Sequence, residues 1–418
     1  MIKLIYTSED PMKDEFKIYR LDNFGRGISY YNGRVIFIEN ALEDENIEAE
    51  VKEIKKNVYE AEATRIIDKS VYRNEPKCPY YKDCGGCNIM HMTYPKQLKF
   101  KEEKVKYLLK KFADIEPDRV KPIISTSQYN YRNKVTLKVR EKVGFYKKKS
   151  YEIVPIISCQ VVMPKINEII KEITNLEYKN VEEIVIKAST QGETMIVLKA
   201  CGDIDEEYFF KKLEYITDNI VVVNEGVSKT IFGKGYILEK VGSYYYKISS
   251  LSFFQVNTEG AEKLYDKVKE YGSLQTNERV LDLYCGTGTI GIYLSDSAKD
   301  VTGLEINNEA VKDAQDNIEI NKVINVKVEQ KDVSKVIDKY ENIELVVLDP
   351  PRSGLSKRAI KNILEINPNR IVYVSCDPAT LSRDLNILKD TYELKEVTPL
   401  DMFPNTYHVE CVCLLMKK

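Results

Sequence analysis

The feature that most constrains the fold is a regular alternation of short apolar runs with helical segments in the carboxy-terminal part of the chain. The apolar runs suit buried β-strands and fall at Val280–Leu283, Val301–Glu305, Val326–Val328, Leu345–Leu348 and Ile371–Val374. Strands that alternate with helices are typical of a parallel sheet covered by helices on both faces. We therefore predict an α/β domain with a doubly wound sheet over residues 251–418.

The remainder of the chain predicts two further domains. Residues 1–70 contain alternating strands such as Gly33–Ile38 and Ile47–Val51, separated by glycines, which is typical of a small OB-like β-barrel. Residues 71–250 mix strands and helices and predict a central α+β domain. A chain of 418 residues is long enough for two or three domains.

Composition argues against a membrane protein and against a disulfide-stabilised secreted protein. No run approaches the roughly 18 consecutive apolar residues of a transmembrane helix. The nine cysteines are odd in number and clustered, which disfavours a disulfide framework. We therefore expect a soluble cytoplasmic protein, without an obligate protein partner, whose cysteines serve metal binding or catalysis. The net charge of −2 does not by itself indicate a nucleic-acid-binding protein.

A glycine-rich turn follows the first strand of the predicted doubly wound sheet. The run from Asp282 leads into Gly286-Thr-Gly288, and such a turn lets the backbone approach a ligand closely. Glu305 ends the next strand about 20 residues later, an offset suited to ribose hydroxyls. Asp332, after the third strand, is placed to bind an adenine amino group. Both NAD and S-adenosylmethionine (SAM) enzymes have this arrangement, and the Asp-x-x-x-Gly-x-Gly opening favours SAM.

Cys376 lies at a junction that favours a nucleophile. It follows an apolar strand, and the next residues, Asp377 and Pro378, predict the start of a helix. Ligands bind at the carboxyl ends of strands in open α/β sheets, and the amino end of a helix favours a thiolate. The alternative for a cysteine considered alone is a small packed side chain.

The fourth strand ends in Asp349-Pro-Pro-Arg352. Methyltransferases that act on exocyclic amines have an aromatic residue where this chain has Arg352. We therefore expect the methyl acceptor to be a carbon atom, which needs prior activation, and Cys376 at the end of the following strand supplies a group for that purpose.

A second group of cysteines predicts a metal site. Cys78, Cys84 and Cys87 are closely spaced, and Cys159 is the natural candidate for a fourth ligand. Three such cysteines in a cytosolic chain are rarely accidental. Their spacing suits either a structural zinc ion or an iron–sulfur cluster.

Several motifs together resemble the bacterial RNA (uracil-C5) methyltransferases across essentially the full length of the chain. They are Phe253–Asn257, the Asp-x-x-Cys-Gly-x-Gly-x-x-Gly turn from Asp282, Asp349–Gly354, Tyr373–Asp384 and His408–Glu410. The resemblance implies that the amino-terminal barrel is a TRAM domain, that the carboxy-terminal domain is a Rossmann-like SAM methyltransferase, and that the four cysteines Cys78, Cys84, Cys87 and Cys159 hold a [4Fe-4S] cluster.

The resemblance also implies the catalytic roles. Cys376 would add to C6 of uracil, and Glu410 would remove the C5 proton after methyl transfer. By alternation alone, Glu410 would be a solvent-facing strand residue, so its catalytic role rests on the resemblance. The residues expected to contact the cofactor are Gln255, Tyr284, Gly286, Gly288, Thr289, Glu305, Asp332 and Asp349.

The expected substrate is a uridine of 23S rRNA, because a TRAM domain together with a four-cysteine cluster resembles the branch of the family that acts on ribosomal RNA. The same chemistry on a tRNA uridine is one alternative, and a non-catalytic RNA-binding protein is another. In every case the expected partner is RNA.

Overall fold

The structure is a computed structural model that describes residues 12–55, 58–335 and 340–418. These residues form two compact units. The first holds the described residues up to Tyr81, together with Gly86–Phe100 and Asn405–Tyr407, and the second holds Lys82–Gly85, Lys101–Pro404 and His408–Lys418. Residues 1–11 of the expected amino-terminal domain lie outside the described residues. The division at residues 70 and 250 stays a prediction.

The first unit is built on a six-stranded sheet with the order β1-β5-β6-β4-β3-β2. Its pairs are antiparallel except for β4 with β6. Alternate residues of β4 and β5, such as Ile36, Ile38 and Ile47, are buried in one apolar cluster, as the alternating pattern predicts. The strands are Met12–Lys17, Arg20–Leu21, Gly27–Tyr31, Arg34–Glu39, Asn46–Lys55 and Val58–Asp68, in chain order.

The central sheet of the second unit has seven strands in the order β13-β12-β11-β10-β7-β8-β9. Helices α2 (Pro164–Ile173) and α3 (Glu206–Leu213) accompany it, and α2 packs on β10. A separate hairpin, β14 (Tyr236–Val241) with β15 (Tyr244–Ser249), follows. The central strands β7 to β13 are Lys134–Val139, Val143–Tyr146, Ile153–Pro155, Val181–Ala188, Thr194–Ala200, Ile220–Asn224 and Val227–Phe232.

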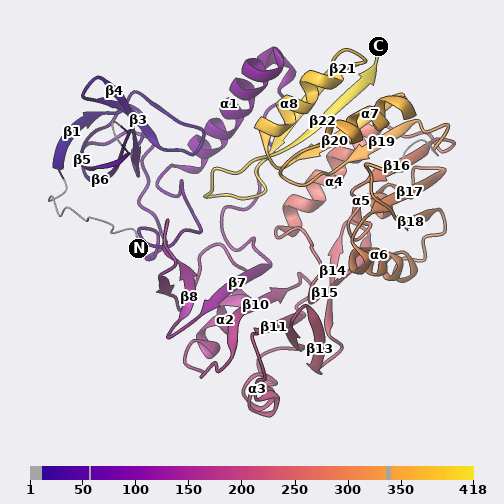
Figure 1. Cartoon of the computed structure of the whole chain (residues 1–418), viewed down its shortest axis with the longest axis horizontal. Helices are drawn as coiled ribbons and strands as arrows, with labels where there is room; N and C mark the ends of the chain where they lie inside the picture. Colours follow the sequence, from indigo (N-terminus) through magenta and orange to yellow (C-terminus); the bar gives the residue numbers. More distant parts are fainter. Residues whose placement is uncertain (1–11, 56–57, 336–339) are drawn as a thin grey trace, which may run out of the picture. The chain divides into compact units, whose positions relative to one another are not determined.

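The carboxy-terminal sheet positions the candidate site. Its order is β18-β17-β16-β19-β20-β22-β21, in which the first five strands are parallel, β22 is antiparallel to β20, and β21 is antiparallel to β22. The predicted doubly wound sheet is therefore confirmed (Figure 1). The strands β16 to β22 are Arg279–Leu283, Asp300–Glu305, Val326–Gln330, Leu345–Leu348, Arg370–Ser375, Tyr392–Leu400 and Glu410–Lys417.

Helices cover both faces of this sheet, as its uniformly apolar strands require. Val372 and Val374 of β20 face α4 and α5, whereas Ile371 and Tyr373 face α7, α8 and the second half of α1. Alternate residues of one strand thus enter two different cores. The helices α1, α4, α5, α6, α7 and α8 are Tyr94–Ala113, Thr258–Gly272, Thr289–Leu294, Asn308–Ile320, Lys357–Ile366 and Pro378–Leu388.

Candidate active site

The candidate active site lies along the carboxyl edge of the parallel strands. Leu283 of β16 pairs with Leu304 of β17 and with Leu348 of β19, and Leu348 pairs with Tyr373 of β20. Four neighbouring strands therefore end at one level of the sheet. The residues that follow these ends share one edge and include Tyr284, Glu305, Asp349 and Cys376. This is the edge at which open α/β sheets bind ligands.

The antiparallel strand β22 brings Glu410 to the same edge. Ser375 at the end of β20 pairs with Cys411, so the next residues, Cys376 and Glu410, are direct neighbours across the two strands. Glu410 is 5% exposed, which contradicts the solvent-facing position that alternation alone suggested. Both faces of β22 are covered, because Val412 packs in the core that holds α4 and Cys411 and Cys413 pack in the core that holds α7 and α8.

Cys376 stands where the sequence predicted, between β20 and α8. The expectation that the helix end would stabilise its thiolate was wrong. Burial, followed by the charges of Glu410 and Asp349, raises the pKa of Cys376 to about 11, and Arg352 acts in the opposite direction. The amino end of α8 is already occupied, because the Asp377 carboxylate accepts hydrogen bonds from the N–H groups of Ala379 and Thr380 at 2.8 and 3.2 Å.

The carboxyl groups at this edge are held in their neutral form more strongly than ordinary carboxyl groups are. Burial raises the pKa of Glu410 to about 8; the charge of Asp349 adds to that effect and Arg352 opposes it. Burial also raises the pKa of Asp349 to about 7. A carboxyl group whose pKa lies near neutrality is suited to accept and release a proton under physiological conditions.

The glycine-rich turn leaves room for a ligand. Gly286 and Gly288 have φ angles of +54° and +74°, a conformation that glycine adopts without strain. A Cβ atom built on Gly286 would meet no atom within 4 Å, so the space beside the turn is open. Glu305 is fixed there, since its carboxylate accepts hydrogen bonds from the N–H groups of Gly286 at 3.1 Å and Asn307 at 2.8 Å.

Asp282 is a site residue that the sequence analysis did not select. It is 1% exposed, and one carboxylate oxygen accepts the Gly291 N–H at 3.1 Å. The other oxygen, Oδ1, is buried and has no hydrogen-bond partner among the described residues. Burial, followed by the charge of Asp349, raises the pKa of Asp282 to about 8. A buried acceptor without a partner is unusual, so this edge fits a ligand that carries a donor or a positive charge, as SAM does.

The other residues expected at the cofactor site are placed as follows. Tyr284 lies close enough to Asp332 for that carboxylate to add to the effect of burial, which raises the tyrosine pKa to about 12. Asp332 accepts hydrogen bonds from the N–H and hydroxyl of Ser334 at 2.8 and 2.7 Å. The Thr289 hydroxyl accepts one from Tyr265 at 3.1 Å. Gln255 precedes the amino end of α4, and its backbone carbonyl accepts a hydrogen bond from the Asn133 side chain at 3.0 Å. Their roles toward a cofactor stay predictions.

The structure does not support the expected metal site. Within residues 12–55, 58–335 and 340–418, no group of three or more His, Cys, Asp and Glu residues is arranged to hold a metal ion. Cys78, Cys84, Cys87 and Cys159 are each partly buried.

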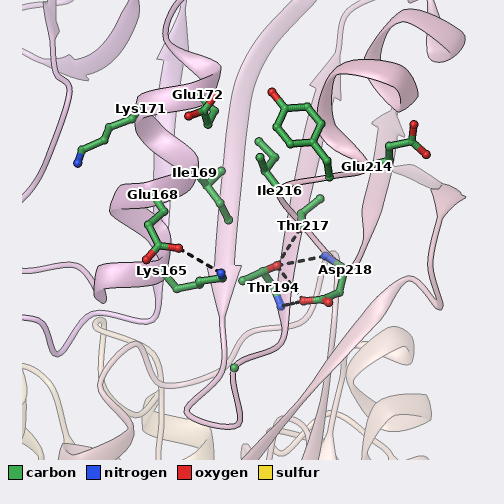
Figure 2. A pocket seen from close by; sticks show the side chains of 12 residues that line it. Lys165, Glu168, Ile169, Lys171, Glu172, Thr194, Glu214, Ile216, Thr217 and Asp218 are labelled. Atoms are coloured by element: carbon green, nitrogen blue, oxygen red, sulfur yellow. Dashed lines mark hydrogen bonds and ion pairs between the residues drawn. The ribbon is translucent and has the colours of Figure 1, made fainter.

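A hollow of about 520 Å³ lies beside α2 in the central region (Figure 2). Its walls carry both signs of charge, and Lys165 pairs with Glu168 at 3.1 Å. Thr194 and Asp218 are hydrogen-bonded to each other at its base. The residues that line it include none of those predicted for the site.

No helix among the described residues is long and apolar enough to cross a membrane.

Known proteins match this chain over almost its whole length. The tRNA (uracil-5-)-methyltransferase family model matches residues 93–418, and the TRAM domain model matches residues 15–64. An uncharacterized RNA methyltransferase from Clostridium acetobutylicum is 38% identical over 97% of both chains, and one from Caldanaerobacter subterraneus is 36% identical over 96% of this chain and 98% of its own.

One solved structure is similar throughout. The Pyrococcus abyssi tRNA (uracil-54, C5)-methyltransferase, in complex with S-adenosyl-L-homocysteine, matches with a TM-score of 0.79 and 29% identity, covering 97% of this chain and 100% of its own. The expected Rossmann-like methyltransferase fold and TRAM domain are thereby confirmed. The chain belongs to the RNA (uracil-5-)-methyltransferase family that uses SAM and carries a TRAM domain.

Proposed function

We propose that this protein methylates C5 of a uridine in 23S rRNA through a covalent bond between Cys376 and C6, giving 5-methyluridine. The observation that carries the proposal is the register of β20 and β22, which places Cys376 directly beside the buried carboxyl group of Glu410. A nucleophile beside a carboxyl group with a pKa of about 8 is the pair that addition and later proton removal need.

Each step is assigned to a residue of this chain. Cys376 first loses its thiol proton to solvent; the thiolate then adds to C6 of uracil, and the C5–C6 electron pair moves into an enolate that makes C5 nucleophilic. Bound SAM supplies an electrophilic methyl group. After C5 has gained that methyl group, the Glu410 carboxylate removes the C5 proton. The electrons of the C5–H bond re-form the double bond, and the C6–S bond breaks to regenerate the Cys376 thiolate.

The electrostatics of the site fit this order of events. The free protein holds Cys376 as a thiol, with a pKa of about 11, which protects it from adventitious oxidation and alkylation. The positive charge of a bound sulfonium, added to that of Arg352, favours the thiolate. Cys376 is therefore expected to become reactive when the site is filled, and the uridine must leave its stack to reach it.

The rRNA substrate rests on the resemblance to the rRNA-modifying branch. A tRNA uridine is the second candidate, because the Pyrococcus abyssi relative of known structure is a tRNA (uracil-54, C5)-methyltransferase. The two candidates use the same residues at the sheet edge and differ only in how RNA is selected.

Unmodified RNAs separate the candidates. Protein and labelled SAM are incubated in parallel with purified 23S rRNA, 16S rRNA and tRNA, and 5-methyluridine is mapped, with Cys376→Ala as the matched variant. Label in 23S rRNA that disappears with the variant supports the proposal. Label confined to tRNA would mean that the substrate is tRNA and that the proposed reaction still holds. Full activity of Cys376→Ala would contradict the covalent route.

We also propose, from the resemblance of the cysteine motif to that of the family, that Cys78, Cys84, Cys87 and Cys159 bind a [4Fe-4S] cluster. No catalytic step is assigned to it. Iron and sulfide analysis with absorption spectra, on protein purified without oxygen, is compared with Cys87→Ser. An iron content of about four atoms per chain in the wild-type protein, lost in the variant, would support the cluster. A colourless wild-type protein without iron would contradict it.

A further inference from the structure

Helix α8 is joined to the two segments that carry the candidate catalytic groups. It begins at Pro378, directly after Cys376 and the capping residue Asp377. Its side chains also contact the loop between β19 and α7. That loop runs from Asp349 to Ser356, is closed by a hydrogen bond from the Gly354 N–H to the Pro351 carbonyl at 2.8 Å, and carries Arg352.

Side chains of α8 bind four backbone groups of the loop. The Thr380 hydroxyl donates to the Arg352 carbonyl at 3.2 Å. The Arg383 guanidinium donates to the carbonyls of Ser353 at 2.9 Å and Leu355 at 3.3 Å. The Asp384 carboxylate accepts the Leu355 N–H at 2.8 Å. We call Thr380, Arg383 and Asp384 the α8 clamp.

Strand β20 of the sheet holds the clamp in place. Asp384 is fully buried, and the same carboxylate oxygen accepts a hydrogen bond from the Tyr373 hydroxyl of β20 at 2.7 Å. Its other oxygen pairs with Arg383 at 2.7 Å. A buried carboxylate whose partners are all satisfied fixes their geometry, so loop, helix and strand β20 are held as one unit.

Gly354 is required for this close approach. It has a φ angle of +71°, and a Cβ atom placed there would lie 2.6 Å from both Arg383 Nη2 and Asp384 Oδ2. Only a residue without a side chain lets the loop backbone come within hydrogen-bonding distance of the clamp.

The clamp sets the position of Arg352 through its backbone. Among the described residues, the exposed Arg352 guanidinium has no hydrogen bond or ion pair that would hold its side chain. Arg352 is nevertheless the cation that acts on both Cys376 and Glu410. Its distance from these groups therefore depends on where the loop backbone is held.

We propose that Thr380, Arg383 and Asp384 are positioning residues that hold Arg352 beside Cys376, so that helix α8 ties the nucleophile to the cation that supports its thiolate. The proposal rests on Cys376 being the nucleophile. In this proposal the clamp residues act through Arg352.

A double-mutant cycle tests whether the clamp acts through Arg352. The variants are Arg383→Gln, Arg352→Gln and both together, with Arg358→Gln on α7 as a matched loss of one exposed positive charge. Thr380→Val removes one hydroxyl only and serves if Arg383→Gln does not fold. The readout is the rate at which iodoacetamide modifies Cys376 at pH 8.5, measured on the peptide that carries it, because this rate follows the thiolate fraction.

We expect Arg352→Gln to slow the modification about three- to tenfold, since it removes a nearby opposite charge. Arg383→Gln and, more weakly, Thr380→Val should slow it in the same direction, while Arg358→Gln leaves it unchanged. The double variant should match Arg352→Gln alone, and methyl transfer should lose kcat with little change in KM for SAM. Additive effects, or an unchanged rate in folded Arg383→Gln and Thr380→Val, would overturn the proposal.

The thiol assay needs neither RNA nor SAM, which separates this proposal from the proposed function. If Cys376→Ala retained methyltransferase activity, the covalent route would fail while the cycle still reported on the clamp. If Cys376→Ala were inactive and the cycle additive, the covalent route would stand and the clamp would fail.

Discussion

Replacing Glu410 by glutamine should stabilise the folded protein as the pH rises. Glu410 is 5% exposed, and burial, followed by the charge of Asp349, raises its pKa from 4.5 to about 8. Folding therefore favours the protonated carboxyl group, and keeping Glu410 ionised in the folded state is unfavourable. Glutamine resembles the neutral acid in shape and cannot ionise, so Glu410→Gln removes this penalty.

The size of this effect on the free energy of unfolding follows from the pKa of Glu410 in the unfolded chain, 4.5, and in the folded protein, about 8. Below about pH 4.5 the carboxyl group is protonated in the folded and unfolded chains, and its ionisation affects neither. Between about pH 5 and pH 8 the wild-type protein should lose about 3–4 kcal/mol of unfolding free energy relative to the variant, and above pH 8 the difference levels off. Any constant effect of the buried amide cancels, because only the change with pH is compared.

Urea unfolding at pH 5, 6, 7 and 8, followed by circular dichroism, measures this difference as the shift in midpoint multiplied by the slope m. Circular dichroism is the suitable signal because the chain has no tryptophan. Glu365→Gln, on the exposed surface of α7, is the matched control and should show no pH-dependent gain. A difference between Glu410→Gln and wild type that stays constant across this range would refute the argument that Glu410 is dehydrated beside Cys376.

Two further predictions concern the cofactor and the loop. Because burial raises the pKa of Asp349 to about 7, its ionised form, which attracts a sulfonium, grows between pH 6 and 8. Calorimetry should therefore show SAM binding more tightly at pH 8 while S-adenosylhomocysteine, whose sulfur is neutral, changes less; equal pH dependence would contradict this. Gly354→Ala places a Cβ atom 2.6 Å from Arg383 and Asp384 at φ +71°, so thermal unfolding should show a loss of about 1–3 kcal/mol. An unchanged melting temperature would mean that the loop moves aside easily.

The sequence predicted those parts of the fold that local patterns determine. The apolar runs beginning at Val280 and Ile371 became parallel strands of one sheet, with β19 between them. Asp377 caps α8 as the Asp-Pro pair indicated. The antiparallel insertion of β22 between β20 and β21 could not be read from the sequence, because the β20–β22 pairing joins segments whose contact depends on the complete sheet.

The features of the site that the sequence did not predict also depend on the complete fold. Glu410 belongs to an alternating strand, and its buried position depends on the core that covers the face it shares with Val412, two residues further along β22. Asp282 was visible at the start of the glycine turn, but its unpaired oxygen is a property of the folded core. The raised pKa of Cys376 was missed because helix-end stabilisation was weighed without burial and without Glu410.

The covalent route is tested most sharply by trapping the bond between Cys376 and RNA. RNA that contains 5-fluorouridine carries fluorine where Glu410 would remove a proton, so elimination should stop and the adduct should persist. Protein, SAM and this RNA are incubated, digested and analysed by mass spectrometry. We expect a methylated fluorouridine nucleotide attached to the peptide that contains Cys376. Turnover of unmodified RNA without any adduct on Cys376, or with an adduct on another cysteine, would contradict it.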